Sequence, residues 1–354
     1  MTKLKNRMDP TQVPSANICK NLKRLFILEP PRVSAYHTIP HFIISACVDG
    51  AFASKCSAMT NRFLLCTAAL AFGIFAYAPA NTAQESPAAV IHDPAPDKAF
   101  PAKMEVPDIP SHGARLYALI YIAAGQGPHP TVLLMHGFPG NEQNMDLAQS
   151  MRRAGWNVAV PHYRGSWGSS GAFSFSNAIE DTQAALDFLR DPENAKKYGV
   201  DTKKIVLIGH SMGGFMVAYT GAHNPDVYAV GLISAWNIGA SFAREPQVAS
   251  NAEFRADASR LAGTTPEALG AEAGRNIHQW NFLDYAPALK DHPILVVESD
   301  DGLTADDKSM ADALRKSGDT RVAEQHIATD HAYSDHRIAL QSVVVQWLNS
   351  LNTK

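Results

Sequence analysis

A serine stands between glycines in the stretch GHSMGG, residues 209–214. The apolar, β-prone run KIVLI precedes this stretch, and residues typical of a helix, FMVAYTGAH, follow it. A G-x-S-x-G motif between a strand and a helix predicts a tight, strained turn that lifts the hydroxyl of Ser211 clear of the sheet. At the helix N-terminus, free N–H groups favour developing negative charge. We therefore predict that Ser211 is a nucleophile; the alternative is a serine that only caps the helix.

A second motif, HGFPG at residues 136–140, directly follows the apolar run TVLLM. A loop in this place can supply one N–H group of an oxyanion hole, and the residue after the nucleophile supplies the other. The backbone amides of Phe138 and Met212 are the candidates. Each such donor stabilises a tetrahedral intermediate by about 3–4 kcal/mol. The alternative is a Gly-Pro turn without a catalytic role.

A serine nucleophile also needs a base, and the base needs an orienting acid; the expected chain order is serine, acid, histidine. The segment IATDHAYSDHR, residues 327–337, lies between the last apolar run and the closing helical segment. His331 falls in this loop, whereas His326 belongs to the preceding strand and His336 to the start of the helix. We therefore predict that His331 is the base.

The acid is expected in the loop after the strand VVES, where Asp300 and Asp301 follow each other. We prefer Asp301, because D-x-x-T then leads into a helix with Thr304 as its cap, and Asp300 is the alternative. Asp306 and Asp307 are expected to be solvated charges in the first turn of that helix.

The candidate residues lie in loops between predicted strands and helices, which appear as short apolar runs separated by helical segments. Strands are predicted at 116–123, 131–137, 157–163, 204–210, 228–236, 292–299 and 321–328, and helices at 179–191, 212–223, 305–317 and 336–351. Runs without polar alternation indicate strands that are buried on both faces. The fold class is therefore α/β, with a doubly wound, mostly parallel sheet.

Residues 237–286 show no strand pattern and predict a small helical insertion before the strand that carries the acid. One of its helices is expected to start at Pro266 with Thr265 as the N-cap. An insertion here would lie over the carboxyl ends of the strands, where such sheets bind ligands. The nearby aromatic side chains are expected either to shape an apolar pocket or to belong to the core; they are Trp236, Phe242, Trp280 and Phe282.

The N-terminal part of the chain differs from the rest. Residues 59–80 combine Arg62, an uncharged apolar stretch and the pattern Ala-Pro-Ala, as in a secretory signal peptide that is cleaved near Ala80. Its apolar part is too short to favour a stable membrane anchor. We expect Met59 to be the true start and residues 1–58 to be a disordered, non-native upstream extension. All four cysteines lie within the first 66 residues, so the exported protein would contain none.

The remaining domain boundaries follow from composition. Residues 81–112, rich in Pro and Ala, are expected to be a linker or irregular lead-in, and residues 113–354 to form the catalytic domain.

The net charge of −3 and the absence of a basic patch argue against a nucleic-acid partner. No motif for a phosphate-bearing cofactor or a metal ion is found, so we expect neither a cofactor nor a metal.

From about residue 113 to the C-terminus, the chain resembles the α/β-hydrolase superfamily. The resemblance lies in four segments and in their order along the chain: HGFPG, GHSMGG, the acidic loop after VVES, and DHAYSDHR. The segment YRGSWGSSG, residues 163–171, is similar to one in the prolyl oligopeptidase-like and dienelactone hydrolase-like branches. The chain has no room for the β-propeller of large prolyl oligopeptidases. The resemblance implies an exported serine hydrolase with a Ser-His-Asp triad and an acyl-enzyme intermediate, acting on carboxylic esters.

Two other functions remain open at this point. The same triad could serve an aminopeptidase or amidase that takes short peptides or amides, or the scaffold could belong to a non-catalytic binding protein.

Overall fold

The structure is a computed structural model, and it describes residues 85–352. The predicted upstream extension and the predicted signal peptide lie outside the described residues. Within residues 85–352, none of the helices combines the length and the apolar character needed to cross a bilayer.

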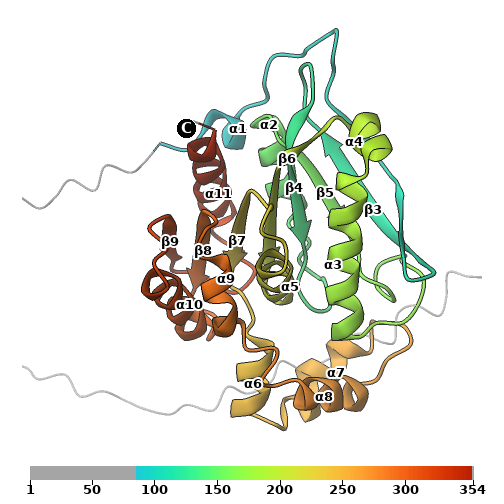
Figure 1. Cartoon of the computed structure of the whole chain (residues 1–354), viewed down its shortest axis with the longest axis vertical. Helices are drawn as coiled ribbons and strands as arrows, with labels where there is room; N and C mark the ends of the chain where they lie inside the picture. The colour runs from blue at the N-terminus through green and yellow to red at the C-terminus, as the bar shows by residue number, and fades with distance from the viewer. Residues whose placement is uncertain (1–84, 353–354) are drawn as a thin grey trace, which may run out of the picture. The chain divides into compact units, whose positions relative to one another are not determined.

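The described residues build one sheet of nine strands with helices on both faces (Figure 1). The order across the sheet is β1-β3-β5-β4-β6-β7-β8-β9, and β2 pairs with β3. Strands β4 to β9 run parallel, whereas β3 is antiparallel to β5. The strands are β1 Lys103–Glu105, β2 Asp108–Ser111, β3 Ala114–Ile122, β4 His129–Met135, β5 Asn157–Pro161, β6 Val200–His210, β7 Ala229–Ile233, β8 Ile294–Ser299 and β9 Val322–Ile327. The predicted α/β class and the mostly parallel sheet are confirmed.

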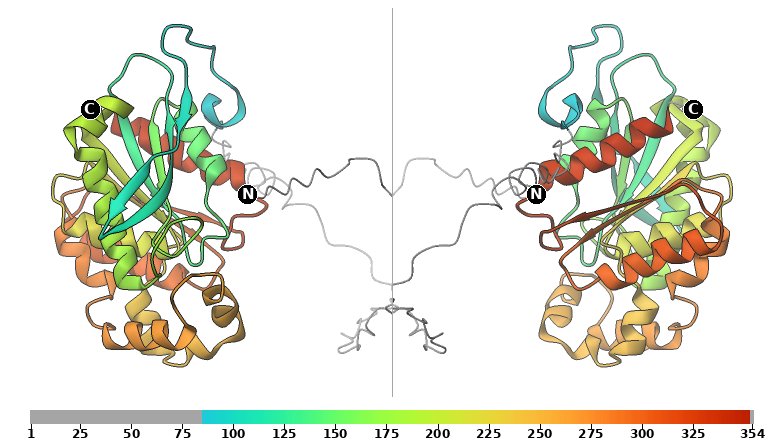
Figure 2. Two further views of the ribbon diagram at one scale, coloured as in Figure 1. Left: turned by 90° about the vertical axis from the view of Figure 1, so that its right-hand side faces the viewer. Right: turned by 90° about the vertical axis from the view of Figure 1, so that its left-hand side faces the viewer.

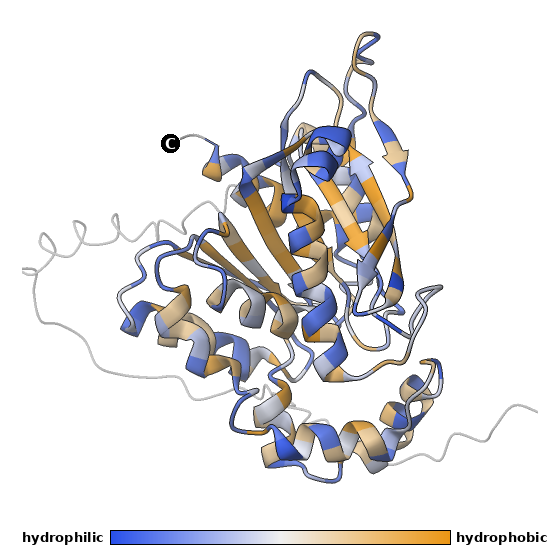
Figure 3. Ribbon diagram, turned by 45° about the vertical axis from the view of Figure 1, so that its right-hand side comes forward, coloured by the Kyte–Doolittle hydropathy of each residue, from blue (hydrophilic) through white to orange (hydrophobic). Residues whose placement is uncertain are grey.

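Alternate residues of the central strands enter two separate cores. In β4, Leu133 and Met135 pack into one core and Val132 and Leu134 into the other, as the two-residue period of a strand requires. Helices α3, α5 and α10 cover the first face, and α2 and α11 cover the second (Figure 2). Figure 3 shows that the central strands are mostly apolar, whereas the helices carry polar residues outward. These helices are α2 Met145–Arg153, α3 Phe175–Arg190, α5 Met212–Ala222, α10 Thr304–Lys316 and α11 Arg337–Leu351.

The predicted insertion is helical and lies beyond one end of the sheet (Figure 1). We refer to residues 237–286 as the cap. It contains α6 Ile238–Arg244, η1 Val248–Ser250, α7 Ala252–Ala258, α8 Pro266–Arg275 and η2 Phe282–Tyr285, and α9 Ala286–Leu289 begins at its end. Helix α8 starts as predicted, with Pro266 in its first turn and the side chain of Thr265 accepting the N–H of Ala268.

The predicted irregular lead-in holds more structure than its composition suggested. Helix α1, Ala88–Ile91, and strands β1 and β2 fall within residues 81–112, and both strands pair with β3. The sheet therefore begins at Lys103 rather than after residue 113. Helix α2 and α4, Pro192–Tyr198, were also not anticipated. Strands of three and four residues give little pattern to detect, and β2 also contains Pro110.

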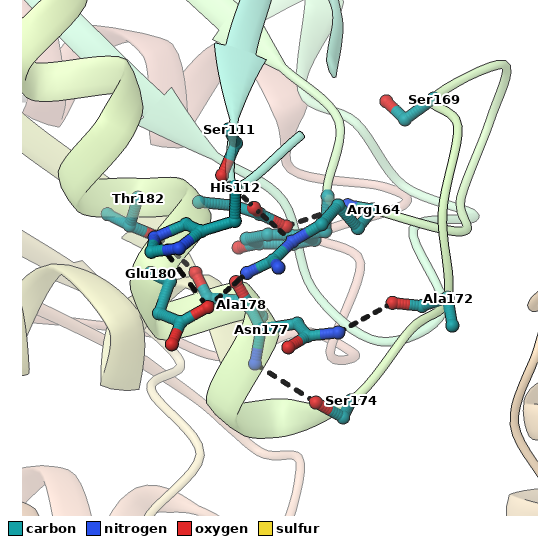
Figure 4. Close-up of polar contacts among 12 residues, drawn as sticks. Ser111, His112, Arg164, Ser169, Ala172, Ser174, Asn177, Ala178, Glu180 and Thr182 are labelled. Carbon is teal, nitrogen blue, oxygen red and sulfur yellow. Dashed lines mark hydrogen bonds and ion pairs between the residues drawn. The ribbon is translucent and has the colours of Figure 1, made fainter. Parts of the chain in front are cut away.

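The loop 163–171 is anchored to the domain through a buried ion pair (Figure 4). The Nε of Arg164 donates to Asp181 Oδ1 at 2.6 Å, and the Arg164 backbone N–H donates to Asp181 Oδ2 at 2.7 Å. Ser111 Oγ, at the end of β2, donates to the same carboxylate at 2.6 Å. Burial raises the pKa of Asp181, although these donors oppose the effect. The conspicuous segment YRGSWGSSG is thus fixed to α3 and to β2.

Three neighbouring strands are each followed by, or end in, a buried histidine. His136 follows β4, His162 follows β5 and His210 ends β6, and all three side chains are almost completely inaccessible. Burial disfavours the charged imidazolium. It lowers the pKa of His136 and His210 to about 3 and that of His162 to about 4. All three are therefore neutral near pH 7.

Because of these histidines, we expect the protein to lose stability in mild acid. Their pKa values in the folded protein lie below those in the unfolded chain. Their contribution to the free energy of unfolding is therefore complete above about pH 6.5 and is lost as the pH falls toward 3–4. Replacing one of them, His162→Phe, should reduce the drop in the free energy of unfolding between pH 7 and pH 5.5 by about 1 kcal/mol. Urea unfolding at the two pH values measures this. The exposed control His278→Gln should leave the drop unchanged, and an equal drop in His162→Phe and in the wild type would contradict the prediction.

Candidate active site

Ser211 occupies a strained turn between β6 and α5, where sequence analysis placed it. Its backbone has φ 58° and ψ −122°, a conformation that side-chain-bearing residues rarely adopt. A Cβ on Gly209 would come within 2.0 Å of Gly213 O, and one on Gly213 within 2.2 Å of Met135 O on β4. Glycine at these two positions therefore avoids a collision with the helix and with β4.

The loop after β7 holds the backbone of Ser211 in this turn. The Ser211 N–H donates to Ile233 O at 2.9 Å, and the Ser211 carbonyl accepts the N–H of Trp236 at 2.9 Å. These two hydrogen bonds tie the nucleophile turn to the neighbouring strand on the side that leads toward β8.

The HGFPG loop lies directly against Ser211. A Cβ on Gly137 would be 2.9 Å from the Cβ of Ser211. Among the hydrogen bonds within residues 85–352, neither the amide of Phe138 nor that of Met212 has an acceptor, so both are free to bind a ligand. Trp167 Nε1 donates to the carbonyl of Pro139 at 2.8 Å and so fixes the loop to the segment 163–171. The role of the two amides as an oxyanion hole remains a prediction.

His331 and Asp301 are hydrogen-bonded to each other. His331 Nδ1 lies 2.7 Å from Asp301 Oδ2, and the carboxylate is buried whereas the imidazole is partly open to solvent. Burial alone would raise the pKa of Asp301. Hydrogen bonds from His331, the Leu303 amide and Ser234 outweigh it and lower the pKa to about 2. An ionised carboxylate only accepts hydrogen bonds, so Nδ1 of His331 carries a proton and the other ring nitrogen, Nε2, is free to act as a base.

The alternative acid, Asp300, faces a different histidine. Its Oδ1 lies 3.1 Å from His326 Nε2, and its side chain is mostly exposed. Of the two aspartates between which the sequence could not decide, the structure thus places Asp301, and not Asp300, against His331.

His210 packs against the imidazole of His331. Its ring lies 4.7 Å from that of His331, centroid to centroid, and its Nε2 donates to the backbone carbonyl of His331 at 2.8 Å. His210 therefore packs directly against the candidate base.

Ser211, His331 and Asp301 line one cavity of about 510 Å³, together with Phe138 and the cap. A larger hollow of about 870 Å³ beside α11 and β9 contains none of these residues. No hydrogen bond of the described residues joins Ser211 Oγ to His331. Such bonds are often long in the absence of substrate and tighten when it binds.

Aromatic side chains form one wall of the cavity. Trp236 lines it, as the pocket interpretation expected, but Phe242, Trp280 and Phe282 are buried in the core instead. Phe254 of α7 also lines the cavity, and its ring stacks on that of Phe138 with centroids 5.1 Å apart. No sequence pattern pointed to Phe254, because it stands alone between Glu253 and Arg255 in the cap.

The expectation that Asp306 and Asp307 are solvated was wrong. Asp307 is fully buried and its Oδ1 accepts the N–H of Ala235 at 3.1 Å, while Asp306 pairs with Arg244 of the cap at 2.7 Å. Burial raises the pKa of Asp307 well above the usual range, and the nearby charge of Asp301 adds to the effect. The expected cap was also wrong: Thr304 is the first residue of α10, and its hydroxyl donates to the carbonyl of Ser299 instead.

Among residues 85–352, no three His, Cys, Asp or Glu side chains are grouped so that they could hold a metal ion. The cavity is lined by Ser211 with its hydroxyl, by the carboxylate-bound imidazole of His331 and by Phe138, whose amide has no acceptor among the described residues.

Parts of the chain are similar to known proteins. Residues 119–233 match the family described as BD-FAE. The chain is 33% identical over 118 residues to alpha/beta hydrolase domain-containing protein WAV2 of Arabidopsis thaliana, and the match covers 33% of this chain and 37% of that protein. It is 27% identical over 128 residues to acylamino-acid-releasing enzyme 1 of Oryza sativa subsp. japonica, covering 33% of this chain and 16% of that enzyme. The chain thus spans less than half the length of these relatives.

The fold is shared with solved structures. An esterase of Pyrobaculum calidifontis aligns with a TM-score of 0.55 and 21% identity, covering 72% of this chain and 88% of the esterase. The mostly parallel sheet, the strained serine turn and this structural similarity show that the chain has the α/β-hydrolase fold.

Proposed function

We propose that the chain is a serine hydrolase that cleaves carboxylic esters through an acyl-enzyme. The observation that carries the proposal is the cavity in which Ser211, on its strained turn, faces the same space as the hydrogen-bonded pair His331 and Asp301. A nucleophile, a base and an acid that orients the base are the elements that acyl transfer requires.

In the first half of the reaction, His331 Nε2 takes the proton of the Ser211 hydroxyl as Oγ attacks the ester carbonyl carbon. Asp301 holds the imidazole in the required tautomer and stabilises the imidazolium that forms. The amides of Phe138 and Met212 donate hydrogen bonds to the oxyanion of the tetrahedral intermediate. When the intermediate collapses, the alcohol leaves with the proton from His331, and the acyl group stays on Ser211.

In the second half, a water molecule gives a proton to His331 as its oxygen attacks the acyl carbonyl carbon. The second tetrahedral intermediate expels Ser211 Oγ, which takes the proton back, and the carboxylic acid is released.

The shape of the cavity supports small to medium esters with an apolar part. A volume of about 510 Å³ falls in the range of small-molecule sites. Phe138, Trp236 and Phe254 give it an aromatic wall, against which an apolar acyl or alcohol group can be buried.

Hydrolysis of amides is a second candidate, because the chain is similar to an acylamino-acid-releasing enzyme over a third of its length. The same three residues would act, and only the leaving group would differ.

A substrate panel tests both candidates. We expect turnover of p-nitrophenyl acyl esters and little turnover of aminoacyl-p-nitroanilides. The variant Ser211→Ala should lower kcat/KM for the esters by more than about 1,000-fold. A fluorophosphonate probe should label the wild type at Ser211 and leave the variant unlabelled. Faster turnover of the anilides would favour the amidase. Failure to label Ser211 in folded protein, together with no turnover, would favour a non-catalytic binding protein.

The two neighbouring aspartates provide a matched pair of variants. Asp301→Asn should lower kcat by about 10³- to 10⁴-fold, because an amide cannot hold the imidazole tautomer as a carboxylate does. Asp300→Asn removes the same charge one residue away, on a side chain that faces His326, and should change kcat less than twofold. Initial rates on one ester measure both. Similar losses in the two variants would exclude a specific role for Asp301.

We also propose that the protein is exported and cleaved near Ala80, as the composition of residues 59–80 suggests. Mass spectrometry of the product made in a bacterial host with a secretion pathway should find an N-terminus close to residue 81. Peptides from residues 1–58 in the exported product would refute the proposal.

A further inference from the structure

Two of the three buried histidines that follow or end β4, β5 and β6 donate a hydrogen bond to the backbone of a loop at the candidate site. His136 Nδ1 lies 2.8 Å from the carbonyl oxygen of Gly137, in the HGFPG loop. His210 Nε2 lies 2.8 Å from the carbonyl oxygen of His331, in the loop after β9. A carbonyl oxygen only accepts hydrogen bonds, so the proton of the neutral imidazole is on Nδ1 in His136 and on Nε2 in His210. The two rings are therefore opposite tautomers, and each is bound to a loop that lines the cavity.

The second nitrogen of each ring is left without a partner. His136 Nε2 and His210 Nδ1 are buried, and neither has a hydrogen-bond partner among residues 85–352. A buried polar atom without a partner costs about 1–3 kcal/mol, and an apolar side chain of similar shape would avoid this cost. Packing alone would therefore favour an apolar residue at both positions. The hydrogen bond that each histidine does make is the interaction that an apolar residue could not supply.

The hydrogen bond of His136 bears on the candidate oxyanion donor. The carbonyl of Gly137 and the N–H of Phe138 belong to one trans peptide unit, so they point in opposite directions. Holding the carbonyl on the side of His136 therefore directs the N–H away from that ring. Gly137 has no side chain to limit the rotation of this peptide, and a Cβ there would be 2.9 Å from the Cβ of Ser211. His136 thus supplies a restraint that a side chain at residue 137 could not.

The hydrogen bond of His210 bears on the candidate base. His210 directly precedes Ser211, at the end of β6. Besides donating to the carbonyl of His331, its ring lies 4.7 Å from the His331 ring, centroid to centroid. Both the backbone and the imidazole of the candidate base are thus held by the residue next to the candidate nucleophile.

We propose that His136 and His210 are positioning residues, His136 for the amide of Phe138 and His210 for the imidazole of His331. Each acts through the backbone of a loop, and neither takes part in the proton transfers. Because β4 and β6 are neighbours in the sheet, the two histidines hold both loops in place around Ser211. The inference rests on the proposed function, since these positions matter for catalysis only if Phe138 donates to an oxyanion and His331 is the base.

Exchanging two side-chain amides at these positions tests the inference. The amide nitrogen of Asn can take the place of His Nδ1, and that of the longer Gln can take the place of His Nε2. His136→Asn and His210→Gln should therefore keep the donor, whereas His136→Gln and His210→Asn should misplace it. Where the donor is misplaced, we expect kcat for a p-nitrophenyl ester to fall about 10-fold or more, with KM changed less than about twofold. Where the donor is kept, kcat should stay within about threefold of the wild type.

His162 provides the matched control. It is also buried, its ring lies 5.1 Å from that of His136, and its Nδ1 likewise has no partner among the described residues. Unlike the other two, its ring makes no hydrogen bond to either loop in this part of the chain. We expect His162→Asn and His162→Gln to lower the melting temperature but to leave kcat of the folded protein within about twofold of the wild type.

The tautomers of the wild type give a readout that needs neither turnover nor a folded variant. Long-range proton–nitrogen NMR spectra of protein labelled at histidine should show His136 protonated on Nδ1 and His210 protonated on Nε2 at neutral pH. The opposite tautomer at either histidine would overturn the inference for that residue. Equal kcat in its Asn and Gln variants, or the reverse order, would do the same. Failure of the proposed function would look different: the wild type would hydrolyse no ester, while both tautomers would still be found.

Discussion

A single buried negative charge, the carboxylate of Asp301, sets the requirements for the rest of the site. An isolated anion in a protein interior is costly, so donors must surround it. Two are present: the imidazole of His331 after β9 and the amide of Leu303 in the loop after β8. Because these donors come from different segments, the charge is satisfied only when the loops after β8 and β9 are both in place. The chemistry of the site and the assembly of this half of the sheet are thus coupled.

The topology explains why these segments meet. Strands β6, β7, β8 and β9 are neighbours in the sheet and run parallel, so their carboxyl ends share one edge. The proposed nucleophile follows β6, the proposed acid follows β8 and the proposed base follows β9. The end of β7 and the loop after it lie between them and hold the backbone of Ser211 through Ile233 and Trp236.

Sequence patterns predicted the parts of this arrangement that are local. The turn at Ser211 and the position of His331 could be predicted because strand, glycine and loop follow one another within a few residues. The choice between Asp300 and Asp301 could not be decided in this way, since consecutive residues at a strand end point in opposite directions. Asp307 was misjudged for a related reason. The first turn of α10 packs beneath the loop after β7, and only tertiary structure turns a first-turn aspartate inward.

In the proposed mechanism, the cap links the substrate wall to the oxyanion donor. The ring of Phe138 contacts Phe173 and Phe175 of the main domain and stacks on Phe254 of α7. The amide of that same Phe138 is the candidate oxyanion donor. A change of volume at Phe254 would therefore act twice, once on the wall that a substrate contacts and once on the backbone that positions the amide. Because aromatic packing is dense and directional, a change at one ring is transmitted to the other. The proposed mechanism therefore ties selectivity to the loop of Phe138 through one stacked pair of rings.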